Sequence, residues 1–524
     1  MAYSQAHAAM ETFALIPNLV RHRPELVVAT LAAVPSLVGN RSGIGLSWDS
    51  TDYIAVGLSM SAGRGALDVT GAPTVIRPPG LSAFVTLGDW LSISPDISLR
   101  GVNAISMMLI VWCTHRLLSR AAVRPTAKWI GVMLVALSPM LLDISTMAWS
   151  EPLFLALILV ALVIATRERA WPWDLALIVI FTAMFFVRYV GPFYAAPIAL
   201  VAAVVQMRTS GIVLSLFRSG TSLAVSLVLP WLWLMRNKDL TGYLTGYREA
   251  GGGTLLDPLK TFTGTLGSWL LARPPLGGNG GIYLNWNDFS GYMKAAGVVV
   301  WVLLALLMTS YFLRPRQTTR GATTIMAACL LLFVSYGGFS IYRFVYHEMG
   351  PLDSRMMSGL YVPLILMLVI ALDTSVGRIP TTTSRRFFSI GVLAALPMLV
   401  VPTWHAVVTV ADSISYGDSG RHWGSVGFKV APIYQFVAQL PDNAAVYSNE
   451  PQSLFAATFH WPIRNQYMYQ IPYDLPCDQR YFVWFNQSYL PDGKPVGGVV
   501  VYEDSWGQVI DLDACDTDIN RFWP

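Results

Sequence analysis

Two acidic side chains close to the first apolar segment could carry out chemistry. Asp49 and Asp52 stand three positions apart, a spacing that places both carboxylates on one face if the stretch is helical. A carboxylate at the outer edge of a membrane could take the proton from an attacking hydroxyl group. The alternative is a structural role, with Asp49 or Ser50 as the N-cap of a surface helix that continues to Ala62. Spacing alone leaves both roles open.

A third acid, Glu151, stands directly before Pro152 at the start of a later apolar segment. A glutamate at this position complements the positive end of a helix dipole, which is a purely structural role. The alternative is an acid that faces the substrate. Asp52 and Glu151 are therefore both candidates for a second active-site acid.

Arginine residues recur at the ends of apolar segments that are expected to face outward. Arg188 follows one such segment, Arg236 ends another and Arg355 opens a third, while Arg77 precedes a Pro-Pro-Gly turn. Any one of them could anchor a helix at the lipid headgroups. Together they could hold the phosphate of a lipid-linked substrate, because a guanidinium binds phosphate through two parallel hydrogen bonds. Further polar candidates for such a site are Tyr53, Tyr189, Asn237, His347, Glu348 and Asp353.

Motifs for other chemistries are missing from the sequence. It has no P-loop, no dinucleotide-binding glycine motif, no HExxH and no nucleophile elbow, so ATP-driven transport has no support. No cysteine or histidine spacing typical of a metal site occurs either. A divalent metal remains possible as a cofactor, but no motif supports one.

The elements that carry these residues follow from the composition. Of 524 residues, 54% are hydrophobic and only 13% are charged, about half the charged fraction of a soluble protein. This excludes a soluble enzyme, a disordered chain and a disulfide-rich secreted scaffold. It predicts an α-helical polytopic membrane protein. About eleven transmembrane helices are expected, near residues 26–38, 99–118, 129–142, 152–166, 173–187, 190–206, 220–235, 293–313, 322–340, 356–372 and 387–404.

The distribution of basic residues predicts which side of the membrane each loop faces. Arginines precede the first span and recur in alternate short loops, which assigns these loops to the cytosol. An odd number of spans from a cytosolic start places the C-terminal part outside. The candidate acids and arginines then face outward as well, in long segments such as residues 39–98.

The last 120 residues differ from the rest. Residues 1–404 carry 29 Lys and Arg against 18 Asp and Glu, whereas residues 405–524 carry 6 against 13. We therefore expect a transmembrane module over 1–404 and a soluble extracytoplasmic domain over 405–524, whose acidity argues against nucleic acid as a partner. In a small α/β or α+β layer, buried strands are expected at 481–485 and 498–502, another strand at 445–448, and an amphipathic helix at 430–440.

The four cysteines divide in the same way. Cys113 and Cys329 lie in apolar segments, where they are expected to be inert packing residues. Cys477 and Cys515 both lie in the C-terminal domain, and an oxidising compartment would favour a disulfide between them. Two reduced thiols in a cytosolic domain are the alternative.

The order of the short motifs resembles that of the bacterial GT-C superfamily of glycosyltransferases. The protein O-mannosyltransferase-like enzymes and the lipid A aminoarabinose transferases are the most similar groups, and the resemblance covers most of the chain. The motifs that carry it are, in chain order, Asp49 to Tyr53, Arg77 to Gly80, Ser150 to Pro152, Arg188 to Gly191, Pro230 with Trp231, Arg236 with Asn237, Thr241 with Gly242, Gly246 to Arg248, Asp353 to Arg355, and Tyr447 to Pro451.

This resemblance implies a membrane glycosyltransferase that uses a polyprenyl-phosphate sugar. The sugar would pass, with inversion, to a hydroxyl group of a lipid, glycan or protein acceptor on the outer face of the bacterial inner membrane. Asp49 is then the expected catalytic base, and Arg355, Arg236 and Arg77 are expected to bind the donor phosphate. The sequence departs from the family where Asp52 replaces the usual Arg or Lys, and Ser50 replaces an acid.

Two other classes of function remain open. A transporter or flippase for a lipid-linked sugar would also carry acids and arginines along its pathway. However, the polar residues here cluster at the outer edge, and no inverted repeat is visible. A non-catalytic assembly subunit is the second alternative, although such a subunit would not need acids and arginines at so many outer helix ends.

Overall fold

The structure is a computed structural model. It describes residues 23–168, 170–247, 254–271, 290–312, 319–347, 354–376, ten positions between 400 and 414, and residues 419–441, 444–459, 463–465, 480–486 and 498–512. These residues form two compact units. The first combines Met1–Leu37, Val102–Ser145 and Ser150–Asp412, and the second combines Val38–Gly101, Thr146–Trp149 and Ser413–Pro524.

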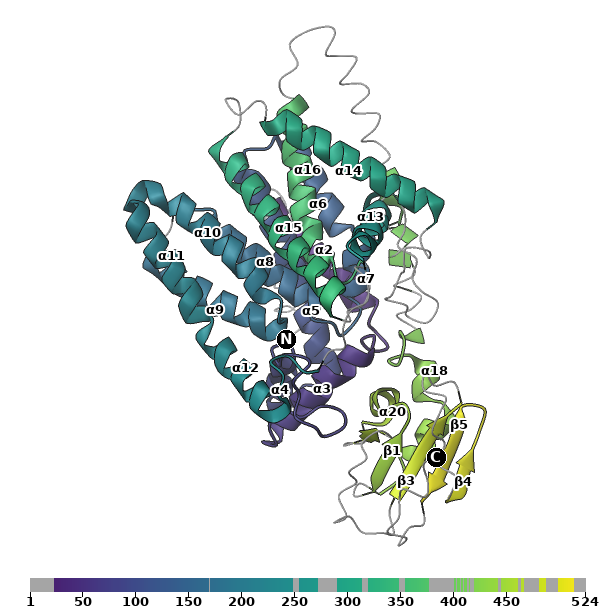
Figure 1. Ribbon diagram of the computed structural model, residues 1–524. Coiled ribbons are helices and arrows are strands. Elements are labelled where there is room, and N and C mark those ends of the chain that lie inside the picture. Colours follow the sequence, from purple (N-terminus) through teal and green to yellow (C-terminus); the bar gives the residue numbers. More distant parts are fainter. Residues whose placement is uncertain are drawn as a thin grey trace, which may run out of the picture. The chain divides into compact units, whose positions relative to one another are not determined.

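The first unit is made of apolar helices (Figure 1). Five helices of the described part are long and apolar enough to cross a membrane: α5 (Pro95–Arg120), α6 with α7 (Pro125–Ile144), α10 (Gly191–Ser210), α11 with α12 (Ile212–Thr241) and α15 (Arg320–Tyr346). The shorter apolar helices are α2 (Pro24–Val38), α8 (Glu151–Ala165), α9 (Trp171–Val187), α14 (Gly291–Phe312) and α16 (Tyr361–Val376). The predicted multi-pass helical class is confirmed. The number of eleven spans stays a prediction, and residues 387–404 lie largely outside the described part.

One helix of this unit was not predicted from the sequence. Helix α13 (Leu256–Leu271) lies in the segment that was expected to be an outer loop, and it packs against α14. Gly267 and Gly297 lie at the contact, where a Cβ atom on either would collide with a carbonyl of the other helix. The two glycines let the backbones approach closely, which is typical of helix pairs in membranes.

The second unit contains two short helices from the segment after α2. Helix α3 (Trp48–Ser61) packs against α4 (Ser82–Trp90), and Gly57 allows the close approach because a Cβ atom there would collide with Val85. The Thr86 hydroxyl also donates to the Gly57 carbonyl at 2.9 Å. This packing fixes the face of α3 that carries the candidate acids.

The C-terminal part of the second unit is a small mixed sheet in the order β2-β1-β3-β5-β4. Strands β1 and β2 and strands β1 and β3 pair in parallel, whereas β5 pairs antiparallel with β3 and β4. Its core contains Tyr447, Phe482, Trp484, Ile510 and Leu512. The elements are α18 (Val426–Lys429), α19 (Pro432–Val437), β1 (Ala445–Ser448), α20 (Pro451–Thr458), β2 (Ile463–Asn465), β3 (Arg480–Phe485), β4 (Val499–Glu503) and β5 (Gly507–Asp511).

Most of the predicted C-terminal elements are present, with two corrections. The strand expected at 498–502 exists as β4, but it is not buried, because it is an edge strand whose valines are exposed. The helix expected at 430–440 is only Pro432–Val437. The division at residue 404 stays a prediction, since the second unit also includes Val38–Gly101.

The cysteine predictions are tested only in part. Cys113 and Cys329 are buried in α5 and α15, which confirms them as packing residues. Cys477 and Cys515 lie outside the described residues, so their disulfide stays a prediction.

Candidate active site

Helix α3 places the two leading acids one turn apart. Its N-cap is Ser47, whose side chain does not cap the helix, and Asp49 lies in the first turn. The hydroxyl oxygens of Ser47 and Ser50 lie 3.2 Å apart, and the indole N–H of Trp149 donates to Ser47 Oγ at 2.8 Å. The interpretation of Asp49 or Ser50 as an N-cap is therefore wrong, although the helix itself extends as expected. The Asp49 carboxylate is directed to an arginine instead.

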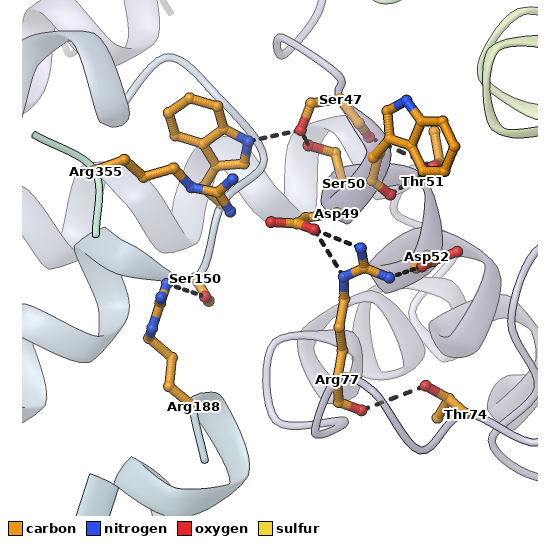
Figure 2. A network of polar contacts seen from close by, with 12 residues as sticks. Ser47, Asp49, Ser50, Thr51, Asp52, Thr74, Arg77, Ser150, Arg188 and Arg355 are labelled. Atoms are coloured by element: carbon orange, nitrogen blue, oxygen red, sulfur yellow. Dashed lines mark hydrogen bonds and ion pairs between the residues drawn. The ribbon is translucent and has the colours of Figure 1, made fainter. Parts of the chain in front are cut away.

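That arginine is Arg77, which bridges both acids (Figure 2). Its Nε donates to Asp49 Oδ1 at 2.8 Å, and its Nη2 lies 2.6 Å from the same oxygen. Its Nη1 donates to Asp52 Oδ2. The three side chains are 22%, 25% and 11% exposed for Arg77, Asp49 and Asp52. They form a partly buried cluster, in which Asp52 is the most enclosed member.

Burial and charge shift the pKa values of this cluster. The pKa of Asp52 is raised to about 6, chiefly by burial, which Arg77 opposes and to which Asp68 and Asp49 add. Burial lowers the pKa of Arg77, but Asp49 and Asp52 outweigh this effect and raise it overall. Arg77 therefore stays charged, and Asp52 takes up a proton near pH 6.

The loop before Arg77 is shaped by a third acid, Asp68. Its Oδ1 accepts hydrogen bonds from the backbone N–H groups of Thr70 and Ala72 at 2.9 and 3.2 Å, and from the Thr70 hydroxyl at 2.7 Å. Burial raises the pKa of Asp68, and these bonds oppose the shift. At the end of the loop, the Thr74 hydroxyl donates to the Arg77 carbonyl at 3.3 Å. These bonds hold the backbone that presents the guanidinium.

Segments from three parts of the chain hold the start of α3. The Gly45 N–H donates to the Thr146 carbonyl, and the Ala148 N–H donates to the Gly45 carbonyl, each at 2.9 Å. On the other side, Leu46 forms a bridge with His422 of the C-terminal part. Helix α20 also packs against α3, and it begins at Pro451, the last residue of the C-terminal motif. The C-terminal residues thus support the helix that carries Asp49.

A second cluster, in the first unit, joins Glu151 to two arginines. Glu151 is the first residue of α8, Arg188 is the C-cap of α9, and Arg355 lies just before a short 3₁₀ helix, Ser358–Leu360. Nη1 of Arg188 and Nε of Arg355 each lie 2.5 Å from Glu151 Oε1. The side chain of Glu151 is 1% exposed, against 18% for Arg188 and 10% for Arg355. Glu151 therefore does more than complement its helix dipole.

Further contacts fix the two arginines of this cluster. Nη1 of Arg188 donates to Ser150 Oγ at 3.2 Å, as Figure 2 shows, and its Nη2 lies 3.8 Å from the Met356 sulfur. The Tyr336 hydroxyl donates to the Met356 carbonyl at 2.5 Å. Tyr336 on α15 therefore supports the backbone next to Arg355.

A third cluster forms around the hydroxyl group of Tyr189, the residue after Arg188. The Tyr189 hydroxyl accepts hydrogen bonds from Trp233 Nε1 at 3.0 Å and from Asn237 Nδ2 at 3.1 Å. Asn237 is fully buried, and its Oδ1 accepts from Arg236 Nη1 at 3.0 Å. The Arg236 guanidinium lies 4.4 Å from the centre of the Trp233 ring, within cation–π range. The neighbouring residues Arg188 and Tyr189 thus contact different groups, the carboxylate of Glu151 and the amide of Asn237.

The remaining predicted residues have simpler positions. Tyr53 is buried on α3. His347 follows α15, and its ring lies 6.0 Å from that of Tyr342. Glu348 and Asp353 lie outside the described residues. In the part of the chain that the structure describes, no group of three His, Cys, Asp or Glu side chains could hold a metal ion.

Sequence reasoning missed several residues that position these clusters. Trp233 could have been found, because it stands one helical turn before Arg236. Tyr336 and Asp68 gave no local signal, since their partners are a backbone carbonyl in another segment and the N–H groups of an irregular loop. Contacts of this kind depend on how distant segments fold together.

The fold is similar to that of a solved membrane glycosyltransferase. ArnT from Cupriavidus metallidurans, in a crystal structure bound to undecaprenyl phosphate, aligns with a TM-score of 0.61 and 13% identity over 94% of this chain and 98% of that chain. Its apo form aligns with a TM-score of 0.58 and 13% identity over 92% and 97%. The arabinofuranosyltransferase AftD from Mycobacteria aligns with a TM-score of 0.49 and 16% identity over 95% of this chain and 40% of that chain.

The two ArnT comparisons confirm the resemblance at the level of the fold. The chain has the fold of the GT-C glycosyltransferase ArnT over nearly its whole length, and it is a multi-pass membrane protein. No protein-family model matches the sequence, and no curated protein matches it.

Proposed function

We propose that this protein is a membrane glycosyltransferase that moves a sugar from a polyprenyl-phosphate donor to an acceptor hydroxyl group, with inversion. The observation that carries the proposal is the shared fold with ArnT, which was crystallised with undecaprenyl phosphate. The partly buried carboxylates of α3 add a group that could act as a base. The acceptor is a lipid, glycan or protein.

The proposed reaction is a single displacement at the anomeric carbon. The acceptor oxygen forms a bond to this carbon while the bond from the carbon to the phosphate oxygen breaks, and the polyprenyl phosphate leaves with the electron pair. Asp49 takes the proton of the acceptor hydroxyl. One in-line attack inverts the anomeric configuration. No general acid is needed, because cations can stabilise the phosphate that leaves.

The second cluster supplies cations suited to that phosphate. Glu151 holds two guanidiniums, so the three side chains together carry a net positive charge. We assign Arg355, with Arg236, to the donor phosphate, because arginine matches phosphate oxygens bidentately. Glu151 then serves to keep Arg355 and Arg188 in place.

The proposal includes the membrane topology. About eleven spans cross the bacterial inner membrane, starting from a cytosolic N-terminus. The chemistry and the domain of residues 405–524 then lie on the outer face. The acidic composition of that domain and the basic residues of the opposite loops support this orientation.

A transfer assay tests the proposal directly. The purified protein in lipid nanodiscs is incubated with polyprenyl-phosphate sugars labelled with ¹⁴C and with lipid, glycan and peptide acceptors. Label should move to one acceptor class, and the anomeric configuration of the product, measured by NMR, should be opposite to that of the donor. The Asp49→Asn variant is the matched control, because it keeps the side-chain volume.

The assay also separates the alternative functions. A flippase would move the labelled lipid between the leaflets of a vesicle without any transfer, and an assembly subunit would do neither. Translocation without transfer for every donor and acceptor would overturn the proposed enzymatic function.

A further inference from the structure

The guanidinium of Arg77 is held by two carboxylates. Its Nε and Nη2 both reach Asp49 Oδ1, and its Nη1 reaches Asp52 Oδ2. Three of its five N–H donors are thus directed to carboxylates. Two donors remain, one on each terminal nitrogen, so the charge around the guanidinium decides whether it could also bind a phosphate.

The local charge also opposes an anion at Arg77. Asp49 and Asp52 outnumber the single guanidinium, so the three side chains together carry a net negative charge. Asp68 is a further acid whose charge raises the pKa of Asp52. Another acid in partly buried surroundings makes the approach of a phosphate less favourable still. The Glu151 cluster, with two guanidiniums on one carboxylate, has the opposite balance.

We propose that Arg77 is a positioning residue for the base Asp49, held in place by Asp52, and that it does not bind the donor phosphate. This inference rests on the proposed transfer reaction. Two contacts to one carboxylate oxygen restrict the rotation of the Asp49 side chain. The contact to Asp52 fixes the guanidinium from the other side, and the hydrogen bond from Thr74 holds its backbone.

The arrangement predicts a dependence on pH through Asp52. The charged groups that act on Asp52 are Asp49 on its own helix, and Asp68 and Arg77 from the loop, and the Val69 backbone gives it a hydrogen bond. Below pH 6 Asp52 takes up a proton, because burial raises its pKa to about 6. The guanidinium is then held by Asp49 alone, so the base loses part of its alignment and kcat falls.

The test compares three arginine variants in the transfer assay. Arg77→Lys keeps the charge but not the fork that reaches two carboxylates. Arg355→Ala serves as the reference for loss of a phosphate ligand. Arg100→Lys serves as the matched control, because Arg100 also pairs with an aspartate of the same unit, Asp96. We expect Arg77→Lys to lower kcat by about 100-fold, which is the cost of displacing a catalytic group by about 1 Å. The donor KM should change less than twofold. The fall of the rate at low pH should also differ from that of the wild type.

Binding of undecaprenyl phosphate, measured by native mass spectrometry, separates this inference from the proposed function. The wild type and Arg77→Lys should bind this lipid equally, whereas Arg355→Ala should bind it more weakly. If Arg77→Lys loses binding as strongly as Arg355→Ala, or keeps a wild-type kcat and pH profile, the positioning role is wrong. If the wild type neither binds the lipid nor transfers a sugar, the proposed function itself fails.

Folding of the variants is checked by melting temperature. If the Arg77→Lys protein does not fold, Asp52→Asn is tested in its place. This variant removes the carboxylate of Asp52 that holds Arg77 and keeps both Arg77 and Asp49. If the transfer rate of the folded Asp52→Asn protein falls at low pH in the same way as that of the wild type, the inference is also overturned.

Discussion

Arg188 and Arg355 converge on a single oxygen atom, Oε1 of Glu151, each at 2.5 Å. Two guanidiniums repel each other when they are brought close in a poorly hydrated environment. The buried carboxylate between them offsets this repulsion. The contact therefore joins the end of α9 to the segment before α16 through the first residue of α8.

Substitution of Glu151 by Gln should weaken both arginines. The variant leaves two partly buried positive charges without their buried carboxylate, and removal of one partner from a buried ion pair costs about 3–5 kcal/mol of stability. We expect a lower melting temperature in detergent and a higher donor KM. Asp257→Asn, at an exposed helix start, is the control and should change neither. A Glu151→Gln protein with wild-type melting would contradict the anchoring role.

Asp49→Asn should abolish transfer while the protein stays folded. A general base contributes about 100- to 10,000-fold to the rate, and the amide cannot accept the proton of the acceptor. Arg77 can still donate to the amide oxygen, so little change in melting temperature is expected. Turnover close to that of the wild type would rule out Asp49 as the base and leave Asp52 or Glu151 as the candidate.

Arg355→Ala should raise the donor KM and also lower kcat. Hydrogen bonds to charged groups contribute about 1.5–3 kcal/mol, which corresponds to a loss of about 10- to 100-fold in kcat/KM. Arg355→Lys should restore only part of the activity, because lysine lacks the bidentate fork. Initial rates measured over a range of donor concentrations would separate the effect on donor KM from the effect on kcat. Unchanged donor kinetics in the alanine variant would refute the phosphate role.

Asp52 should make the stability of the protein fall as pH rises. Its pKa is raised from 3.8 to about 6 by burial, so the folded protein keeps a proton that the unfolded chain has lost. This stabilisation is full below about pH 4 and disappears as pH passes 6, and it amounts to roughly 3 kcal/mol.

Asp52→Asn should flatten the curve of melting temperature against pH between 4 and 7. Part of the slope should remain, because burial also raises the pKa of Asp68. Glu503→Gln, at an exposed residue, should keep the whole slope. The same slope in Asp52→Asn as in the wild type would disprove the assignment.

The domain of residues 405–524 should lie outside the cytosol and contain a disulfide between Cys477 and Cys515. A bridge that closes about 38 residues contributes about 3–4 kcal/mol by loop entropy. Peptide mapping by mass spectrometry without reduction should recover the linked pair. A membrane-impermeant thiol reagent should label a cysteine introduced in this domain in intact cells. Two reduced thiols would refute the bridge, and lack of labelling would reverse the proposed orientation of the whole chain.

The sequence predicted most of the apolar helices because a bilayer imposes a simple rule. A spanning segment must be apolar and long, and this shows in composition alone. The same rule missed α13, because this helix is amphipathic and lies in a stretch with many glycines that was expected to be an outer loop. It failed also for the burial of β4, since three consecutive valines give no information about which strand lies at the edge of a sheet.

The candidate site was predictable as a set of residues but not as a set of contacts. Asp49, Asp52, Glu151 and the arginines stand out because charges are rare in this sequence. Their pairing depends on loop geometry, such as the turn that Asp68 organises before Arg77. Arg77 was expected to bind phosphate, and nothing local in the sequence indicated that two carboxylates of α3 would reach it.

The backbone contacts at the start of α3 have a consequence for biosynthesis. Leu46 pairs with His422, and the Trp423 N–H donates to the Leu46 carbonyl at 3.4 Å. A ribosome makes α3 early and these partners late. The helix that carries Asp49 therefore acquires its full set of neighbours only after most of the chain has been synthesised, so an unfinished protein lacks part of the support for the proposed base.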